Sequence, residues 1–229
     1  MPVYPPATWP VISGEMPSDR ILRIARPYDG CSLKNRTSEL ADLIARKVDK
    51  PAEIVLVKTN CGMFALGVLA AAGVPHPLLG TPYVSMQAIT WLEKIGKDTG
   101  ALTKYNGDYT SLKPGSLLHY NTPGTNNDHV EFLASTVRDS GLGDIVGGGK
   151  ADNLVLYQRN VPVTSNNGRP LDWWLDPDKL GIPWEGVGTG SDGSGLGGAS
   201  ATSGFPSSGG ALALGLLALG GFAFLLLRK

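Results

Sequence analysis

A cysteine and a histidine in this sequence have the types and local settings that nucleophilic catalysis requires. Cys61 stands at the entrance of a strongly apolar run, and His129 opens a strand-like segment about 70 residues later. A thiol in the first turn of a helix meets the positive end of the helix dipole and unpaired backbone N–H groups, which lower its pKa. A thiolate attacks a carbonyl carbon, and an imidazole holds the thiol proton and passes it to the leaving amine. The pair therefore predicts acyl chemistry.

The run that follows Cys61 predicts a helix buried nearly all round. Apolar residues recur at spacings of three and four on more than one face between residues 60 and 73. Asn60 is a cap candidate, Gly73 is a plausible stop, and Pro75 prevents easy continuation.

The other patterns place helices before strands. Amphipathic helices are expected at residues 38–50 and 85–97, and a short strand at 21–24. Strands are expected at 116–120, 128–133, 144–146 and 153–159. This order predicts an α+β fold in which N-terminal helices pack on a small antiparallel sheet.

Composition divides the chain into four parts. Residues 1–20 are a proline-rich, extended arm, residues 21–185 are the folded domain, and residues 186–210 are a flexible Gly/Ser-rich linker. Residues 211–227 are wholly apolar or glycine and predict a transmembrane helix near the lower length limit for crossing a bilayer. The alternative, a helix packed on the domain, makes little sense behind so long a tether. The formal net charge of zero gives no electrostatic footprint for nucleic acid.

The predicted orientation of this membrane anchor is unusual. Arg228 and Lys229 favour a cytoplasmic C-terminus, which would put the domain outside, whereas the proline-interrupted N-terminus does not have the pattern of a signal peptide. An anchor in the inner membrane of a virus particle would resolve the conflict. We expect a single-pass membrane protein with a C-terminal anchor in a bacterial envelope or a virion inner membrane.

Three short motifs resemble those of the papain-like cell-wall cysteine peptidases of the NlpC and CHAP type. They lie at residues 60–64, 113–120 and 128–132, and the resemblance covers roughly residues 55–160. It implies a papain-like fold with Cys61 as nucleophile and His129 as base, and no cofactor or metal. The family's third polar residue lies on the strand after the histidine, where Asn153 is the best match; Asp152 and Glu131 remain alternatives. Ser116 stands where the family usually has aspartate.

The expected function is that of a membrane-tethered cysteine hydrolase, an amidase or endopeptidase, that cleaves peptidoglycan peptide bonds, as a phage virion lysin would. Its expected partners are peptidoglycan and, through residues 211–227, a lipid bilayer. A non-catalytic, tethered wall-binding or virion structural protein is the alternative. An acyltransferase or deamidase that uses the same dyad on a protein or lipid is a third possibility.

Each of these residues also has a structural interpretation. Cys61 is also compatible with an inert core thiol and His129 with a structural strand histidine, because cysteine is among the most buried residues. A disulfide between Cys31 and Cys61 would abolish catalysis. Structural roles are favoured for His76, His119, Cys31 and the adjacent Trp173 and Trp174, which in a strand would face opposite ways. Two cysteines and three histidines do not suggest a zinc site.

Overall fold

The computed structural model describes residues 9–32, 43, 61–80, 88–125, 128–149 and 154–184. The chain divides into two compact units, Met1–Gly190 and Ser191–Lys229, and all described residues belong to the first. The predicted helix at 38–50 (apart from the buried Leu43), the linker and the segment 211–227 lie outside the described residues. Among the described residues, no helix has the length and apolar character needed to span a bilayer.

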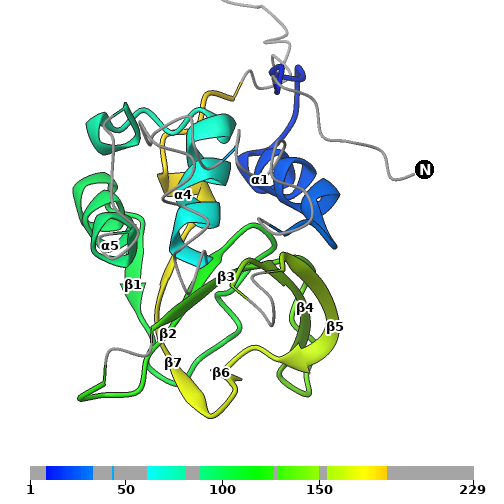
Figure 1. The fold of residues 1–229 in the computed structure, drawn as a ribbon, viewed down its shortest axis with the longest axis vertical. Helices are drawn as coiled ribbons and strands as arrows, with labels where there is room; N and C mark the ends of the chain where they lie inside the picture. The colour runs from blue at the N-terminus through cyan, green and yellow to red at the C-terminus, as the bar shows by residue number, and fades with distance from the viewer. Residues whose placement is uncertain are drawn as a thin grey trace, which may run out of the picture. The chain divides into compact units, whose positions relative to one another are not determined.

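Helices precede strands along the chain, so the predicted α+β class is confirmed (Figure 1). The helices are α1 (Pro17–Ala25), α4 (Cys61–Ala72) and α5 (Ala88–Thr99), with 3-10 turns η1 (Arg26–Tyr28), η2 (Pro77–Gly80) and η5 (Pro177–Lys179). The strands are β1 (Leu102–Lys104), β2 (Leu117–Tyr120), β3 (His129–Leu133), β4 (Leu142–Gly147), β5 (Leu156–Pro162), β6 (Ser165–Asn166) and β7 (Arg169–Leu175).

The strands form an antiparallel sheet in the order β1-β7-β2-β3-β4-β5, and β6 pairs with β7. β3 therefore lies between β2 and β4. In the β2–β3 register Leu118 pairs with Glu131 and Tyr120 pairs with His129, so all four side chains belong to one face of the sheet.

Both faces of β3 are buried. Val130 and Phe132 join a core with apolar side chains of α1, α4 and α5, whereas Leu133 belongs to a second core with Leu118 and Tyr120. Every residue of β3 is buried, including the polar His129 and Glu131. Buried polar groups must find partners in the protein, and those partners define the site below.

The helix after Cys61 is confirmed. α4 runs from Cys61 to Ala72, is buried at every position except Ala70, and ends at Gly73, whose φ of +86° suits a helix C-terminus. Helix α5 reaches Thr99, two residues beyond the predicted end; the predicted start at Ser85 lies outside the described residues. β2, β3 and β4 coincide with predicted strands, while β5 begins and ends later than 153–159.

The predicted strand at residues 21–24 is wrong. These residues belong to α1, which begins at Pro17, so the helix also includes the last four residues of the expected arm. Pro17 is at the first helical turn, where its missing N–H costs nothing. The buried set Arg20, Ile21, Leu22, Ile24 and Ala25 has helical spacing. A four-residue apolar run is too short to separate the two periods.

A glycine on α5 sets how closely this helix approaches the sheet. A Cβ on Gly96 would lie 2.9 Å from Leu102 Cβ on β1 and would clash with the Leu175 side chain on β7. Gly96→Ala should therefore destabilise the domain by about 1–3 kcal/mol, because overpacking forces neighbours to shift. Chemical denaturation measures this change. Lys97→Ala, at an exposed neighbouring position, is the control and should stay within about 0.5 kcal/mol; equal effects would contradict this packing.

Candidate active site

Cys61 is the first residue of α4, and only 4% of its surface is exposed. Because α4 is apolar on all sides, it packs in the core against β3 and β4, and this packing brings its N-terminus to the sheet. The next residue, Gly62, permits a close approach of α5, since a Cβ there would lie 2.8 Å from Ala88 Cβ.

The structure brings Cys61 and His129 together. His129 opens β3, is 6% exposed, and its side chain interacts with the Cys61 side chain. Burial raises the pKa of the Cys61 thiol, but the hydrogen bond and charge of His129, with the backbone groups of Val130 and Gly62, outweigh burial and lower that pKa. The sequence-based expectation of a lowered thiol pKa agrees with this balance.

His129 is shifted in the opposite direction. Burial lowers its pKa, whereas hydrogen bonds and charges from Cys61 and Glu131 raise the pKa to about 9. A lowered thiol pKa and a raised imidazole pKa both shift the pair toward the thiolate–imidazolium form. That pair is a nucleophile next to a general acid.

Glu131 is the group on the other side of His129. It lies two residues along the same face of β3, its side chain is fully buried, and its Oε1 is 3.3 Å from His129 Nε2. Because Nε2 faces this carboxylate, Nδ1 is the ring nitrogen available to the Cys61 sulfur. Asn166 Nδ2 on β6 donates a hydrogen bond to the second carboxylate oxygen, Oε2.

Asn166 is the residue of this cluster that sequence reasoning missed. The residues after it, Asn167 and Gly168, have φ values of +50° and +78°, as a two-residue hairpin turn between β6 and β7 requires. The Asn-Gly pair in the sequence was a signal for this hairpin. Nothing local in the sequence indicates that Asn166 reaches Glu131.

The glycine run at residues 147–149 explains how Glu131 fits. A Cβ on Gly147 of β4 would lie 2.6 Å from Glu131 Cγ and 3.1 Å from its Oε1. The backbone at Gly147 therefore approaches the Glu131 side chain closely. The predicted third residue Asn153, and its neighbour Asp152, lie outside the described residues.

The other histidines lie in different settings. The His119 ring stacks on Trp173 with centroids 4.3 Å apart, and its nitrogens lie 3.5 Å from an Asp172 oxygen and 3.6 Å from an Asp128 oxygen. Burial lowers the His119 pKa and outweighs the charges of Asp128 and Asp172, which raise it.

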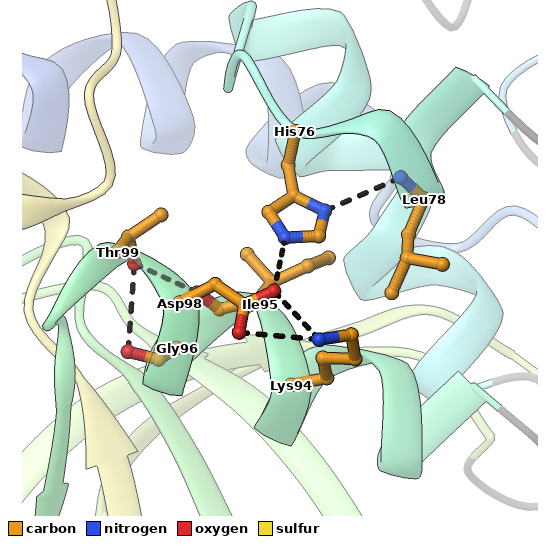
Figure 2. A network of polar contacts seen from close by, with 7 residues as sticks. All are labelled: His76, Leu78, Lys94, Ile95, Gly96, Asp98 and Thr99. Atoms are coloured by element: carbon orange, nitrogen blue, oxygen red, sulfur yellow. Dashed lines mark hydrogen bonds and ion pairs between the residues drawn. The ribbon is translucent and has the colours of Figure 1, made fainter.

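His76 links two helical segments, as Figure 2 shows. Its Nδ1 accepts a hydrogen bond from Leu78 N at 3.2 Å, which assigns the proton to Nε2, and Nε2 lies 3.0 Å from Asp98 Oδ2 on α5. Lys94 also donates to Asp98. These contacts tie η2 to α5 and support the structural interpretation of His76.

The remaining candidates have structural positions. Cys31 and Cys61 are both free thiols, so the disulfide alternative is not formed. Ser116 Oγ accepts from Lys113 N at 3.3 Å and so closes the turn before β2. Trp173 and Trp174 are both buried, one in each core, as their opposite facing requires. In the described ranges, His, Cys, Asp and Glu do not gather in threes that could hold a metal ion.

Comparison with protein-family models, with curated proteins and with solved structures finds no match for this chain.

The thiol titration gives a direct test of the dyad. With a small alkylating agent and mass spectrometry, Cys61 should react with a pKa below the usual value of about 8.5, because His129 stabilises the thiolate. In His129→Ala the Cys61 pKa should rise above that value, because burial still raises it and the imidazole that lowered it is gone. Cys31→Ala should leave the Cys61 profile unchanged. A Cys61 that stays unreactive in the folded protein at all pH values would contradict the dyad.

Proposed function

We propose that this protein is a membrane-tethered cysteine hydrolase, an amidase or endopeptidase that cleaves peptide bonds of peptidoglycan. The single observation that supports hydrolysis is that the buried Cys61 thiol, at the start of α4, and the buried His129 ring on β3 interact and shift each other's pKa. The choice of peptidoglycan, and of a papain-like fold, comes from the resemblance of residues 60–64, 113–120 and 128–132 to NlpC- and CHAP-type enzymes.

The proposed reaction has two halves. The Cys61 thiolate attacks the amide carbonyl carbon to form a tetrahedral intermediate, and the His129 imidazolium gives its proton to the leaving nitrogen as the C–N bond breaks. The acyl group is then a thioester on Cys61. His129, now neutral, takes a proton from water as the water oxygen attacks the thioester carbon. The C–S bond then breaks, the carboxylic acid leaves, and the Cys61 thiolate and the His129 imidazolium are restored.

The C-terminal sequence gives this activity a location. Residues 211–227 would anchor the chain in a bilayer, and the linker 186–210 would let the domain reach the wall from a fixed point. A phage particle with an inner membrane, or a bacterial envelope, is the setting we propose.

The burial of Cys61 supports a second candidate. A thiol that is 4% exposed also suits a non-catalytic, wall-binding or virion structural protein in which Cys61 is a core residue. The two candidates differ in turnover: the first releases soluble wall fragments, and the second binds the wall without releasing them.

Activity measurements on purified peptidoglycan distinguish them. Cys61→Ala and His129→Ala should each lower fragment release by at least about 10³-fold, because nucleophile and base act as a unit. Circular dichroism should show both variants folded. Cys31→Ala, which removes the other thiol, is the matched control and should retain activity. Unchanged release by Cys61→Ala would refute the proposal, and wall binding without release by the unaltered protein would favour the second candidate.

A further inference from the structure

We propose that Glu131 is the positioning residue that orients His129, and that Asn166 and Gly147 hold it in place. The inference rests on the proposed function, because orientation matters only if Cys61 and His129 react together. It gives the role expected of Asn153 to a residue on the same strand as the histidine.

The first argument is the burial of the Glu131 carboxylate. Its side chain is fully buried on the central strand β3, where an unpaired carboxylate would be very costly. Oε2 accepts a hydrogen bond from Asn166 Nδ2, and Oε1 lies 3.3 Å from His129 Nε2 in an ion-pair contact. Each partner uses a different oxygen, so the carboxylate is fixed from both sides.

The second argument is the space made by Gly147. The β3–β4 register that pairs Phe132 with Val146 places Gly147 opposite Glu131, and a Cβ there would lie 2.6 Å from Glu131 Cγ. No side chain at position 147 can therefore reach His129 while Glu131 holds this place. Because Gly147 on β4 has no side chain, the Glu131 side chain on β3 can occupy the space beside it.

Four neighbours of Glu131 on other strands are uncharged: Leu118 and Tyr120 on β2, Gly147 on β4 and Asn166 on β6. Burial, with the charge of Glu131, raises the pKa of Tyr120 well above its usual value, and its hydroxyl donates to Val163 O at 3.2 Å. The His129 imidazolium places a positive charge next to Glu131, with Nε2 3.3 Å from Oε1.

Orientation and charge then follow from one contact. A carboxylate at Nε2 fixes the ring so that Nδ1 points to the thiol, and it stabilises the charged ring. The imidazolium in turn stabilises the thiolate. Removing the carboxylate charge should lower the pKa of His129 and raise that of Cys61, which narrows the pH range of the reactive pair from both ends.

The test uses isosteric exchanges that alter hydrogen bonding without altering volume. Glu131→Gln removes the negative charge and leaves one acceptor oxygen where the carboxylate has two, so Asn166 keeps a contact only if its amide turns to present Oδ1. Asn166→Asp alone replaces a hydrogen-bond donor with a second carboxylate, which repels the carboxylate of Glu131. When both exchanges are combined, the new amide on β3 can donate to the new carboxylate on β6 while its oxygen accepts from His129, so the contact is restored.

The readout is the pH profile of Cys61 alkylation in the full chain, which needs no substrate. Glu131→Gln should raise the thiol pKa by about one unit, a tenfold change in the acid dissociation constant of the thiol. It should also lower the upper pH limit of fragment release, which lies near the His129 pKa of about 9. Adding Asn166→Asp to Glu131→Gln should recover at least part of both shifts.

Matched controls separate a structural effect from a positioning effect. Asp176→Asn removes another buried carboxylate, bound by Lys113 and Asp178 N, and should leave the Cys61 profile unchanged. If Glu131→Gln does not fold, Gly147→Ala takes its place, because it pushes Glu131 aside. Gly143 lies on β4, as Gly147 does, and a Cβ there would crowd Val163 and Leu133. Gly143→Ala is therefore the control for Gly147→Ala.

Three results would overturn the inference. One is an unchanged Cys61 profile in Glu131→Gln or Gly147→Ala. Another is a shift of the Cys61 pKa in the double variant that equals the sum of the shifts in Glu131→Gln and Asn166→Asp alone. A third is a raised Cys61 pKa in Asn153→Ala while Glu131→Gln leaves the Cys61 alkylation profile unchanged. Failure of the proposed function is distinct, since it would show as no fragment release by a protein whose Cys61 titration still depends on Glu131.

Discussion

The buried contact between Cys61 and His129 is the interaction on which the rest of the site depends. Burial alone raises the thiol pKa and lowers the imidazole pKa, so each residue alone would be neutral. Together, and with the Glu131 carboxylate beside His129, they reverse both shifts, because the opposite charges stabilise each other in a medium with little water. Because this mutual stabilisation weakens with distance, it depends on a fixed position of α4 against β3.

Packing supplies that constraint. α4 is buried on nearly every side, so it has one favourable position, and its N-terminal residue faces the start of β3. β3 is held by β2 and β4 and buried on both faces. Glycines at 62 and 147 remove the side chains that would separate the site from α5 and from β4. The reactive groups thus lie on regular elements and not on loops, which gives them a defined geometry.

The predictable part of this structure is the part with local causes. The apolar spacing after Cys61 predicts a helix, and the apolar segment at His129 predicts a strand. Each pattern is local, so both elements and the positions where they begin follow from the sequence. The run at residues 21–24 was too short to reveal its helical period, and α1 was missed. The contact of Asn166 with Glu131 joins residues 35 positions apart through the β6–β7 hairpin, and no local pattern encodes such a pairing.

The placement of base and carboxylate on a single strand has its own physical logic. Residues two apart on a strand share a face at fixed spacing, so the pairing of His129 with Glu131 does not depend on the register between strands. The cost appears elsewhere, since the carboxylate occupies the surface of β4 and permits only glycine at position 147. It also requires a donor for its second oxygen, which β6 supplies through Asn166. Positions 131, 147 and 166 are thus coupled: a side chain introduced at 147 is compatible with this site only if Glu131 becomes smaller, and Asn166 then loses its acceptor.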